Sequence, residues 1–171
     1  MKAHSTVLCP VDFSEAAMAG LDAAVAMAER IGAEILLFHA VPPLPLPARS
    51  EAPQTFDIEG YQRELLKSAK RELREMASRN IPASLTMRSV VVSGAAAEEI
   101  CRVAEDENVS MIVMATHGQT DAKAAVSGST TEKVVRCACC PVLAVPFPDP
   151  SRGDSTTFVR DWGDQTEGSE L

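Results

Sequence analysis

Short apolar runs alternate along the chain with segments of helical periodicity. Five apolar runs, bounded by Gly, Pro or polar residues, have the length of buried strands. Between them, apolar side chains recur every three or four residues, which is the spacing of helices that bury one face. The predicted strands span residues 6–11, 34–41, 85–92, 110–115 and 141–146, and the predicted helices span residues 14–31, 58–80, 96–107 and 129–138.

This alternation predicts an α/β fold with a doubly wound, open parallel sheet and helices on both faces. Polar residues in the third strand favour an edge position, and the most apolar run, 110–115, favours the centre of the sheet. Ligands bind such sheets outside the carboxyl ends of the strands, where the winding direction reverses. We therefore look for chemistry in the loops after Val11, Val41 and Ala115.

The loop after the fourth strand carries two glycines. Gly118 and Gly128 are ten residues apart, and Gly128-Ser129 leads directly into a helix that has the capping-box pattern Ser129-x-x-Glu132. A helix N-terminus offers free N–H groups and a partial positive charge, so it attracts phosphate. Two interpretations stay open from this loop alone: a phosphate cradle, or a glycine turn followed by an ordinary capped helix.

Several short motifs together resemble the universal stress protein family over residues 4–147. They are the Leu-Cys-Pro-Val-Asp-Phe-Ser start at 8–14, the Thr-His-Gly turn at 116–118, the Gly-Ser helix start at 128–129 and the Cys-Pro-Val-Leu run at 140–143. The resemblance implies five parallel strands in the order 3-2-1-4-5. It also implies a homodimer that pairs through the last strand, 141–146.

The ATP-binding branch of that family has the pattern Gly-x2-Gly-x9-Gly-Ser/Thr. This chain has Ala115, Gly118, Gly128 and Ser129 at the same spacing, so alanine replaces the first glycine. The added methyl group either crowds the ribose and adenine or is absorbed by a small backbone shift. The resemblance implies ATP as the ligand, with Mg²⁺ or Mn²⁺ on its phosphates.

The same resemblance assigns a role to each site residue. Asp12 takes the ribose or the adenine edge beside the Pro10 backbone, and the main chain of Val41 binds adenine. Asp12 has a structural alternative, because an acid just before a helix stabilises the helix dipole without a ligand. The remaining implied residues are Met114 and Ala115 on the pocket wall, and Gly118, Gly128, Ser129 and Thr130 on the phosphates.

Three other polar residues lie near these loops. We expect His117 to have a structural part in the turn and His39, at the end of an apolar strand, to be a hydrogen-bonded interior histidine. Lys123, inside the glycine loop, either is solvated or reaches a terminal phosphate. No nucleophile, base and orienting group occur at a recognisable spacing, so we expect no dedicated enzyme and at most slow ATP hydrolysis.

Cysteines crowd near the end of the last helix. Cys137, Cys139 and Cys140 suggest a metal, but zinc sites need four ligands, and Cys9 and Cys101 fall on other elements. We expect small buried thiols, with oxidation to a disulfide or redox sensing as the alternative.

Composition narrows the classes of partner. The net charge is −8, and no basic patch is evident, which argues against a nucleic-acid partner. Neither a P-loop nor a Gly-x-Gly-x-x-Gly turn is present. No run approaches the length of a membrane span and no export signal is evident, so we expect no membrane partner and a cytoplasmic location.

We expect a nucleotide-binding domain, residues 1–148, followed by an acidic, flexible tail, residues 149–171. The tail holds six acidic residues and two arginines and has no apolar periodicity. We expect a nucleotide-dependent regulatory switch in a stress response. The alternatives are a dimeric interaction module without nucleotide, which Ala115 favours, and a slow nucleotide hydrolase.

Overall fold

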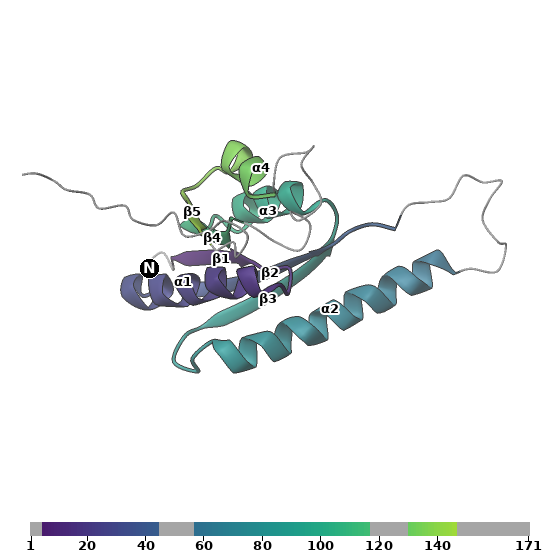
Figure 1. Cartoon of the computed structure of the whole chain (residues 1–171), viewed down its shortest axis with the longest axis horizontal. Helices are drawn as coiled ribbons and strands as arrows, with labels where there is room; N and C mark the ends of the chain where they lie inside the picture. The colour runs from purple at the N-terminus through teal and green to yellow at the C-terminus, as the bar shows by residue number, and fades with distance from the viewer. Residues whose placement is uncertain (1–4, 45–56, 117–129, 147–171) are drawn as a thin grey trace, which may run out of the picture.

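A computed structural model describes residues 5–44, 57–116 and 130–146 of the 171-residue chain. Strands and helices alternate in this part of the chain, as the hydrophobic pattern predicted (Figure 1). The expected domain boundary at residue 148 and the acidic tail lie outside the described residues. The elements are β1 (Thr6–Pro10), α1 (Glu15–Ile31), β2 (Glu34–Val41), α2 (Ile58–Asn80), β3 (Met87–Ser93), α3 (Ala96–Asp106), β4 (Met111–Ala115), α4 (Thr130–Cys137) and β5 (Val142–Val145).

The five strands form one sheet in the order β3-β2-β1-β4-β5, and every pair of neighbours is parallel. This confirms the expected fold class, the strand order and the edge position of β3. The expectation that the most apolar run is the centre of the sheet is wrong, because β1 is the middle strand and β4 lies next to it. Apolarity reports burial on both faces, and all inner strands share that burial.

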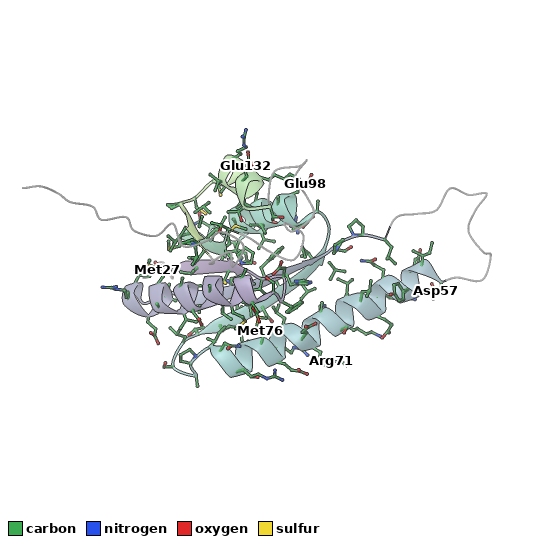
Figure 2. The ribbon with its side chains drawn as sticks, viewed as in Figure 1. Met27, Asp57, Arg71, Met76, Glu98 and Glu132 are labelled. Carbon is green, nitrogen blue, oxygen red and sulfur yellow. A yellow bond between two sulfur atoms is a disulfide. The ribbon has the colours of Figure 1, made fainter. Side chains whose placement is uncertain are left out.

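Side chains alternate between two cores along each inner strand, as the two-residue period of a strand requires. In β2, Ile35 and Leu37 point into the core under α1 and α2, whereas Leu36 and Phe38 point into the core under α3 and α4. The helices therefore form two layers with the sheet between them (Figure 1). Figure 2 shows Glu132 of α4 on the side opposite α2.

Local signals explain where the first helix begins and ends. Ser14 has extended backbone, and its side chain accepts a hydrogen bond of 3.2 Å from the Ala17 N–H, which is the expected N-cap geometry. Gly32 ends the helix in the left-handed conformation at φ 66°. Glycine adopts this conformation without the steric cost that a Cβ brings.

Apolar residues recur along α2 at helical spacing and predict an inner stripe of Tyr61, Leu65, Ala69, Leu73, Met76 and Ala77. The helix covers β2 and β3 with only part of this stripe. Ala69, Leu73 and Ala77 are buried, but Tyr61 is 48% exposed and does not belong to the core. The hydrophobic pattern predicted the helical face correctly but could not show where along the helix the sheet contacts end.

Candidate functional site

The winding of the sheet reverses between β1 and β4. These two strands are neighbours in the sheet, yet α1, which follows β1, packs in the core on one face, and α3, which precedes β4, packs on the other. Because all strands are parallel, Val11, Val41 and Ala115 follow or end their strands at the same edge. This edge is the place where doubly wound sheets bind ligands.

The turn from β1 to α1 is held by backbone and ring contacts. The Val11 N–H donates a hydrogen bond of 2.9 Å to the Phe38 carbonyl, and Nδ1 of His39 lies 2.8 Å from the Val11 carbonyl oxygen. Phe13 has a positive φ of 63°, and its ring centroid lies 4.4 Å from that of His39. A non-glycine residue at positive φ is uncommon, so the surrounding contacts must hold this turn.

Asp12 lies at the tip of that turn, directly after β1. Its Oδ1 atom accepts hydrogen bonds from both the backbone N–H, at 3.1 Å, and the hydroxyl of Ser14. The carboxylate is partly exposed and therefore has both a structural contact and access to solvent. Asp12 therefore lies just before α1, where the sequence left open a role in stabilising the helix dipole, and it contacts the N-cap residue Ser14 without being buried.

Pro10 and Val41 lie on the two strands beside that turn. Pro10 is the last residue of β1 and pairs in register with Phe38 of β2. Val41 is buried, and its carbonyl oxygen accepts a hydrogen bond of 3.0 Å from the Gly94 N–H. A carbonyl oxygen has two lone pairs, so this bond leaves acceptor capacity at Val41.

The end of β4 is packed closely by α1. A Cβ atom placed on Gly20 would lie 2.9 Å from the backbone nitrogen of Ala115, so the helix touches the strand there with no side chain between them. Ala115 is 8% exposed, and Met114 is also buried. By the alternation of side chains, the Ala115 methyl group lies on the face of α1 together with Val113, and Met114 points to the opposite core.

Helix α4 begins beside the end of β4. Thr130 is its first residue, and the hydroxyl of Thr131 donates a hydrogen bond of 2.8 Å to the Ala115 carbonyl oxygen. This buried bond fixes the first turn of α4 at the carboxyl edge. Gly118, Gly128 and Ser129 lie outside the described residues, as do His117 and Lys123.

The sequence interpretation missed two residues that build this edge. Thr131 anchors α4, and Gly20 lets α1 approach the end of β4. A glycine inside an otherwise apolar helical stripe was the signal for Gly20, because a helical glycine often has a packing reason. Thr131 gave no separate signal, since hydroxyl residues are common at any helix start.

The comparison with known proteins agrees with this geometry. Residues 4–146 match the model of the universal stress protein family. The chain belongs to this family. The match covers every described strand and helix and ends just after β5.

Individual members of the family are similar over most of their length. A universal stress protein of Methanocaldococcus jannaschii is 29% identical over 153 residues, which cover 83% of this chain and 94% of that protein. One from Thermus aquaticus is 32% identical over 140 residues, covering 82% of this chain and 97% of that protein. The solved structure of the Methanocaldococcus jannaschii protein superposes with a TM-score of 0.71 and covers 85% of this chain and 98% of its own.

Some members of the family bind nucleotides. One universal stress protein has been solved in complex with cAMP, with 19% identity and a TM-score of 0.58. Another, from Archaeoglobus fulgidus, has been solved in complex with dAMP, with 18% identity and a TM-score of 0.50. At these identities the likeness establishes a shared fold with this chain, and the ligands are properties of those two proteins.

The cysteines differ from the sequence expectation in this family member. Cys101 of α3 and Cys137 of α4 form a disulfide, which is the alternative that the sequence left open for Cys137. Cys137 and Cys139 are exposed and Cys140 is a half-buried free thiol, so the prediction of buried thiols is wrong for Cys137 and Cys139. Cys9 is a buried free thiol, as expected, and burial raises its pKa to about 12. The sequence placed Cys101 and Cys137 on different elements correctly but could not show that the two helices are adjacent.

Other features of the described residues lie away from this edge. A hollow of about 370 Å³, lined in part by Gly32, Ser84 and Thr86, lies at the opposite, amino edge of the sheet. Within residues 5–44, 57–116 and 130–146, no group of three His, Cys, Asp or Glu side chains is arranged to hold a metal ion. None of the helices in this part of the chain combines the length and apolarity needed to cross a bilayer.

Proposed function

We propose that this universal stress protein binds ATP at the carboxyl edge of its sheet and acts as a nucleotide-dependent regulatory switch. One observation carries the proposal: at the point of winding reversal, the Asp12 carboxylate, the end of β4 and the first turn of α4 meet at one edge. The hydrogen bond between Thr131 and Ala115 holds the last two together. That arrangement offers an acid for the ribose and a helix N-terminus for the phosphates.

The nucleoside part fits the described residues. Asp12 is partly exposed, and its position is fixed by Ser14, so a ribose hydroxyl can donate to it without a change in the turn. The Val41 carbonyl retains acceptor capacity for an adenine amino group beside Pro10. By the alternation along β4 the buried Ala115 methyl group lies toward α1, and we propose that it leaves room for a nucleoside outside the strand ends.

The phosphate part rests on α4 and on the glycine motif. Thr130 is at the start of a helix whose free N–H groups favour an anion. Gly118, Gly128 and Ser129 precede it at the spacing of the ATP-binding pattern, and we propose that their backbone and the Ser129 hydroxyl complete the phosphate contacts. Met114 supports the wall of the site from the core behind it. We propose that Mg²⁺ or Mn²⁺ binds through the phosphate oxygens.

The homologous complexes support a purine nucleotide as the class of ligand. The cAMP and dAMP complexes both hold an adenine base and a sugar phosphate. The choice of ATP over shorter nucleotides rests on the motif spacing from Ala115 to Ser129 in this chain.

We propose a homodimer as the assembled form. β5 is an edge strand that pairs only with β4 among the described strands, and Leu143 on it is 36% exposed. A short apolar edge strand invites pairing with a second copy, which satisfies its outward N–H and C=O groups. The cytoplasmic location expected from the sequence stays a prediction.

Calorimetric titration with ATP, with and without Mg²⁺, tests the proposal. We expect saturable binding that also raises the melting temperature, because a ligand selective for the folded state stabilises it. Asp12→Asn should weaken ATP binding by about ten-fold, corresponding to about 1.4 kcal/mol. The control Asp22→Asn makes the same charge change at an exposed position of α1 and should leave the affinity unchanged. Absence of binding and of stabilisation at millimolar ATP would contradict the proposal.

The replacement of the motif's first glycine by Ala115 favours a second candidate, a dimeric interaction module that binds no nucleotide. The same titration separates the two, since that candidate predicts a dimer with no response to ATP. Slow hydrolysis is distinguished from passive binding by release of ADP or AMP over time, compared with a Gly118→Asp variant.

A further inference from the structure

A disulfide joins the two helices on one face of the sheet. Cys101 of α3 and Cys137 at the last residue of α4 are 36 positions apart in sequence, and their Cα atoms are 6.2 Å apart. The helices lie side by side in Figure 1, and Ala138 and Cys140 pack with the same core. The proposed nucleotide site does not use this pair of cysteines.

One residue of this bridge is exposed to solvent and the other is partly buried. Cys137 is exposed, and Cys101 is partly buried with its sulfur 3.9 Å from the Val134 carbonyl oxygen. A second thiol, Cys139, is free and exposed two residues beyond Cys137. Cys9, in contrast, is buried in the other core and takes no part. The sulfur of Cys137 lies 3.9 Å from the Ala97 carbonyl oxygen, and Cys137 is the more exposed of the two bridged residues.

Helix α4 is short and buries few of its own residues. It has eight residues, and only Thr131 and Val134 are buried. A helix of this length is not stable by itself in water, so its position depends on tertiary contacts. The bridge secures its last residue, and the Thr131 hydroxyl secures its first turn at the Ala115 carbonyl. Because α4 is short and rigid, the disulfide at its last residue also restrains its N-terminus.

We propose that Cys101 and Cys137 form a reversible thiol–disulfide site, and that their oxidation by a low-molecular-weight disulfide fixes α4 against α3 and strengthens ligand binding at the α4 N-terminus. The second part rests on the proposed nucleotide binding, and the first part does not. In a reducing compartment, protein disulfides are usually transient and regulatory, which agrees with a bridge in which Cys137 is exposed.

The chemistry is a two-step exchange. The Cys137 thiolate attacks one sulfur of glutathione disulfide, which forms a mixed disulfide and releases one glutathione thiolate. The Cys101 thiolate then attacks the Cys137 sulfur and releases the second glutathione. The two cysteines lose two protons and two electrons, and glutathione disulfide gains both as two thiols. Reduction by excess glutathione runs through the same steps in reverse.

Equilibration of the whole protein in glutathione buffers of varied ratio tests the first part. After acid quenching and alkylation, mass spectrometry reports the fraction of Cys101 and Cys137 in the bridge. We expect a cooperative two-electron transition within the range that glutathione buffers span, unchanged by Cys139→Ser. A pair that stays oxidised, or stays reduced, across the whole range would overturn the proposal.

Two measurements on the oxidised and reduced wild-type protein test the consequence. Hydrogen exchange should show a loss of protection in α4 on reduction, with β2 unchanged. The affinity for ATP should fall by about five-fold or more on reduction, the lower range of allosteric coupling. Cys137→Ser should behave as the reduced form under both conditions, and Cys139→Ser as wild type.

The outcomes separate this inference from the proposed function. Equal protection of α4 in both redox states would overturn the proposal, even if the thiols interconvert. A thiol transition with altered α4 protection but no ATP binding in either state would instead contradict the proposed function and leave the redox site standing.

Discussion

The hydroxyl of Thr131 donates a buried hydrogen bond of 2.8 Å to the carbonyl oxygen of Ala115. This bond connects the first turn of α4 to the last residue of β4, which are more than a dozen residues apart in sequence. A helix N-terminus can act on an anion only if it is held in place. The pair therefore couples the stability of the sheet edge to the proposed phosphate site.

Replacing Thr131 with valine removes the donor and keeps the shape of the side chain. The buried carbonyl of Ala115 then loses a partner, so we expect the free energy of unfolding to fall by about 1–3 kcal/mol and ATP binding to weaken. The matched control is Thr6→Val. Thr6 is 4% exposed and donates to Glu34 at 3.1 Å at the opposite edge. In urea unfolding, the Thr6→Val variant should lose a comparable amount of stability, and its affinity for ATP should match that of wild type. Equal ATP affinities for the two variants would contradict a role for Thr131 in binding.

Ala115→Gly restores the glycine of the ATP-binding pattern. Because the methyl group is buried toward α1, its removal should change the ATP dissociation constant by less than about three-fold, or about 0.7 kcal/mol. Stability should fall by about 0.5–1 kcal/mol, since glycine loses more backbone freedom on folding. Calorimetric titration measures the first quantity and urea unfolding the second. A large gain in affinity would show that the methyl group crowds the ligand.

Gly20→Ala tests the close approach of α1 to β4. Alanine is favoured over glycine in a helix by about 1 kcal/mol, so an open position would become more stable. Here the new Cβ would lie 2.9 Å from the Ala115 backbone nitrogen, and the helix or the strand must shift. We expect a net loss of about 1–3 kcal/mol in the free energy of unfolding. A gain in melting temperature would show that α1 and β4 accommodate the added methyl group without loss of stability.

Two proline variants in β5 separate dimer contacts from contacts within the sheet. The Pro141 carbonyl accepts a hydrogen bond from Ile112 of β4, and the Val145 carbonyl accepts one from Thr116, just after β4. By the two-residue period, the backbone N–H of Leu143 points toward β4 and the Ala144 N–H points outward. Ala144→Pro should leave the fold intact and convert the proposed dimer to a monomer in sedimentation analysis. Leu143→Pro removes an inward N–H and should destabilise the protomer itself. A monomeric wild-type protein would contradict the dimer proposal.

Cys9 makes stability depend on pH in the alkaline range. Burial raises its pKa from 9.0 to about 12 in the folded protein. Between these values the unfolded chain has lost the proton and the folded chain retains it, so stability falls as pH rises above 9. The slope from this group is about 1.4 kcal/mol per pH unit. Urea unfolding of Cys9→Ala should show a shallower decline from pH 9 to 11, and the exposed Cys139→Ala should follow wild type.

Much of the fold followed from local patterns. Alternating apolar runs and helical stripes fixed the number, kind and order of elements, and Ser14 and Gly32 marked the ends of α1. Strand ends shifted by one or two residues, since pairing with a neighbour decides where a strand stops. Among the candidate site residues, Asp12, Val41 and Ala115 lie at the expected edge, because the ends of parallel strands converge there.

The wrong predictions concern contacts between residues that are far apart in the sequence. Tyr61 fits the apolar stripe of α2 but is exposed, because that part of the helix has little sheet to cover. Cys101 and Cys137 occur on separate elements, and only the adjacency of α3 and α4 makes them a disulfide. In each case the local sequence gives the type of side chain, but the residues that surround it in the fold belong to distant segments of the chain.

By itself, the sequence determined the alternating elements, the parallel sheet and the edge at which a ligand is expected, because hydrophobic periodicity and helix caps act over a few residues. The tertiary structure alone decided that Thr131 holds the Ala115 carbonyl, that Gly20 admits α1 to the end of β4, and that α3 and α4 are joined. These relationships depend on how the helices pack against the sheet. Close packing brings together residues that are far apart in sequence, so local sequence patterns do not predict which of them will be in contact.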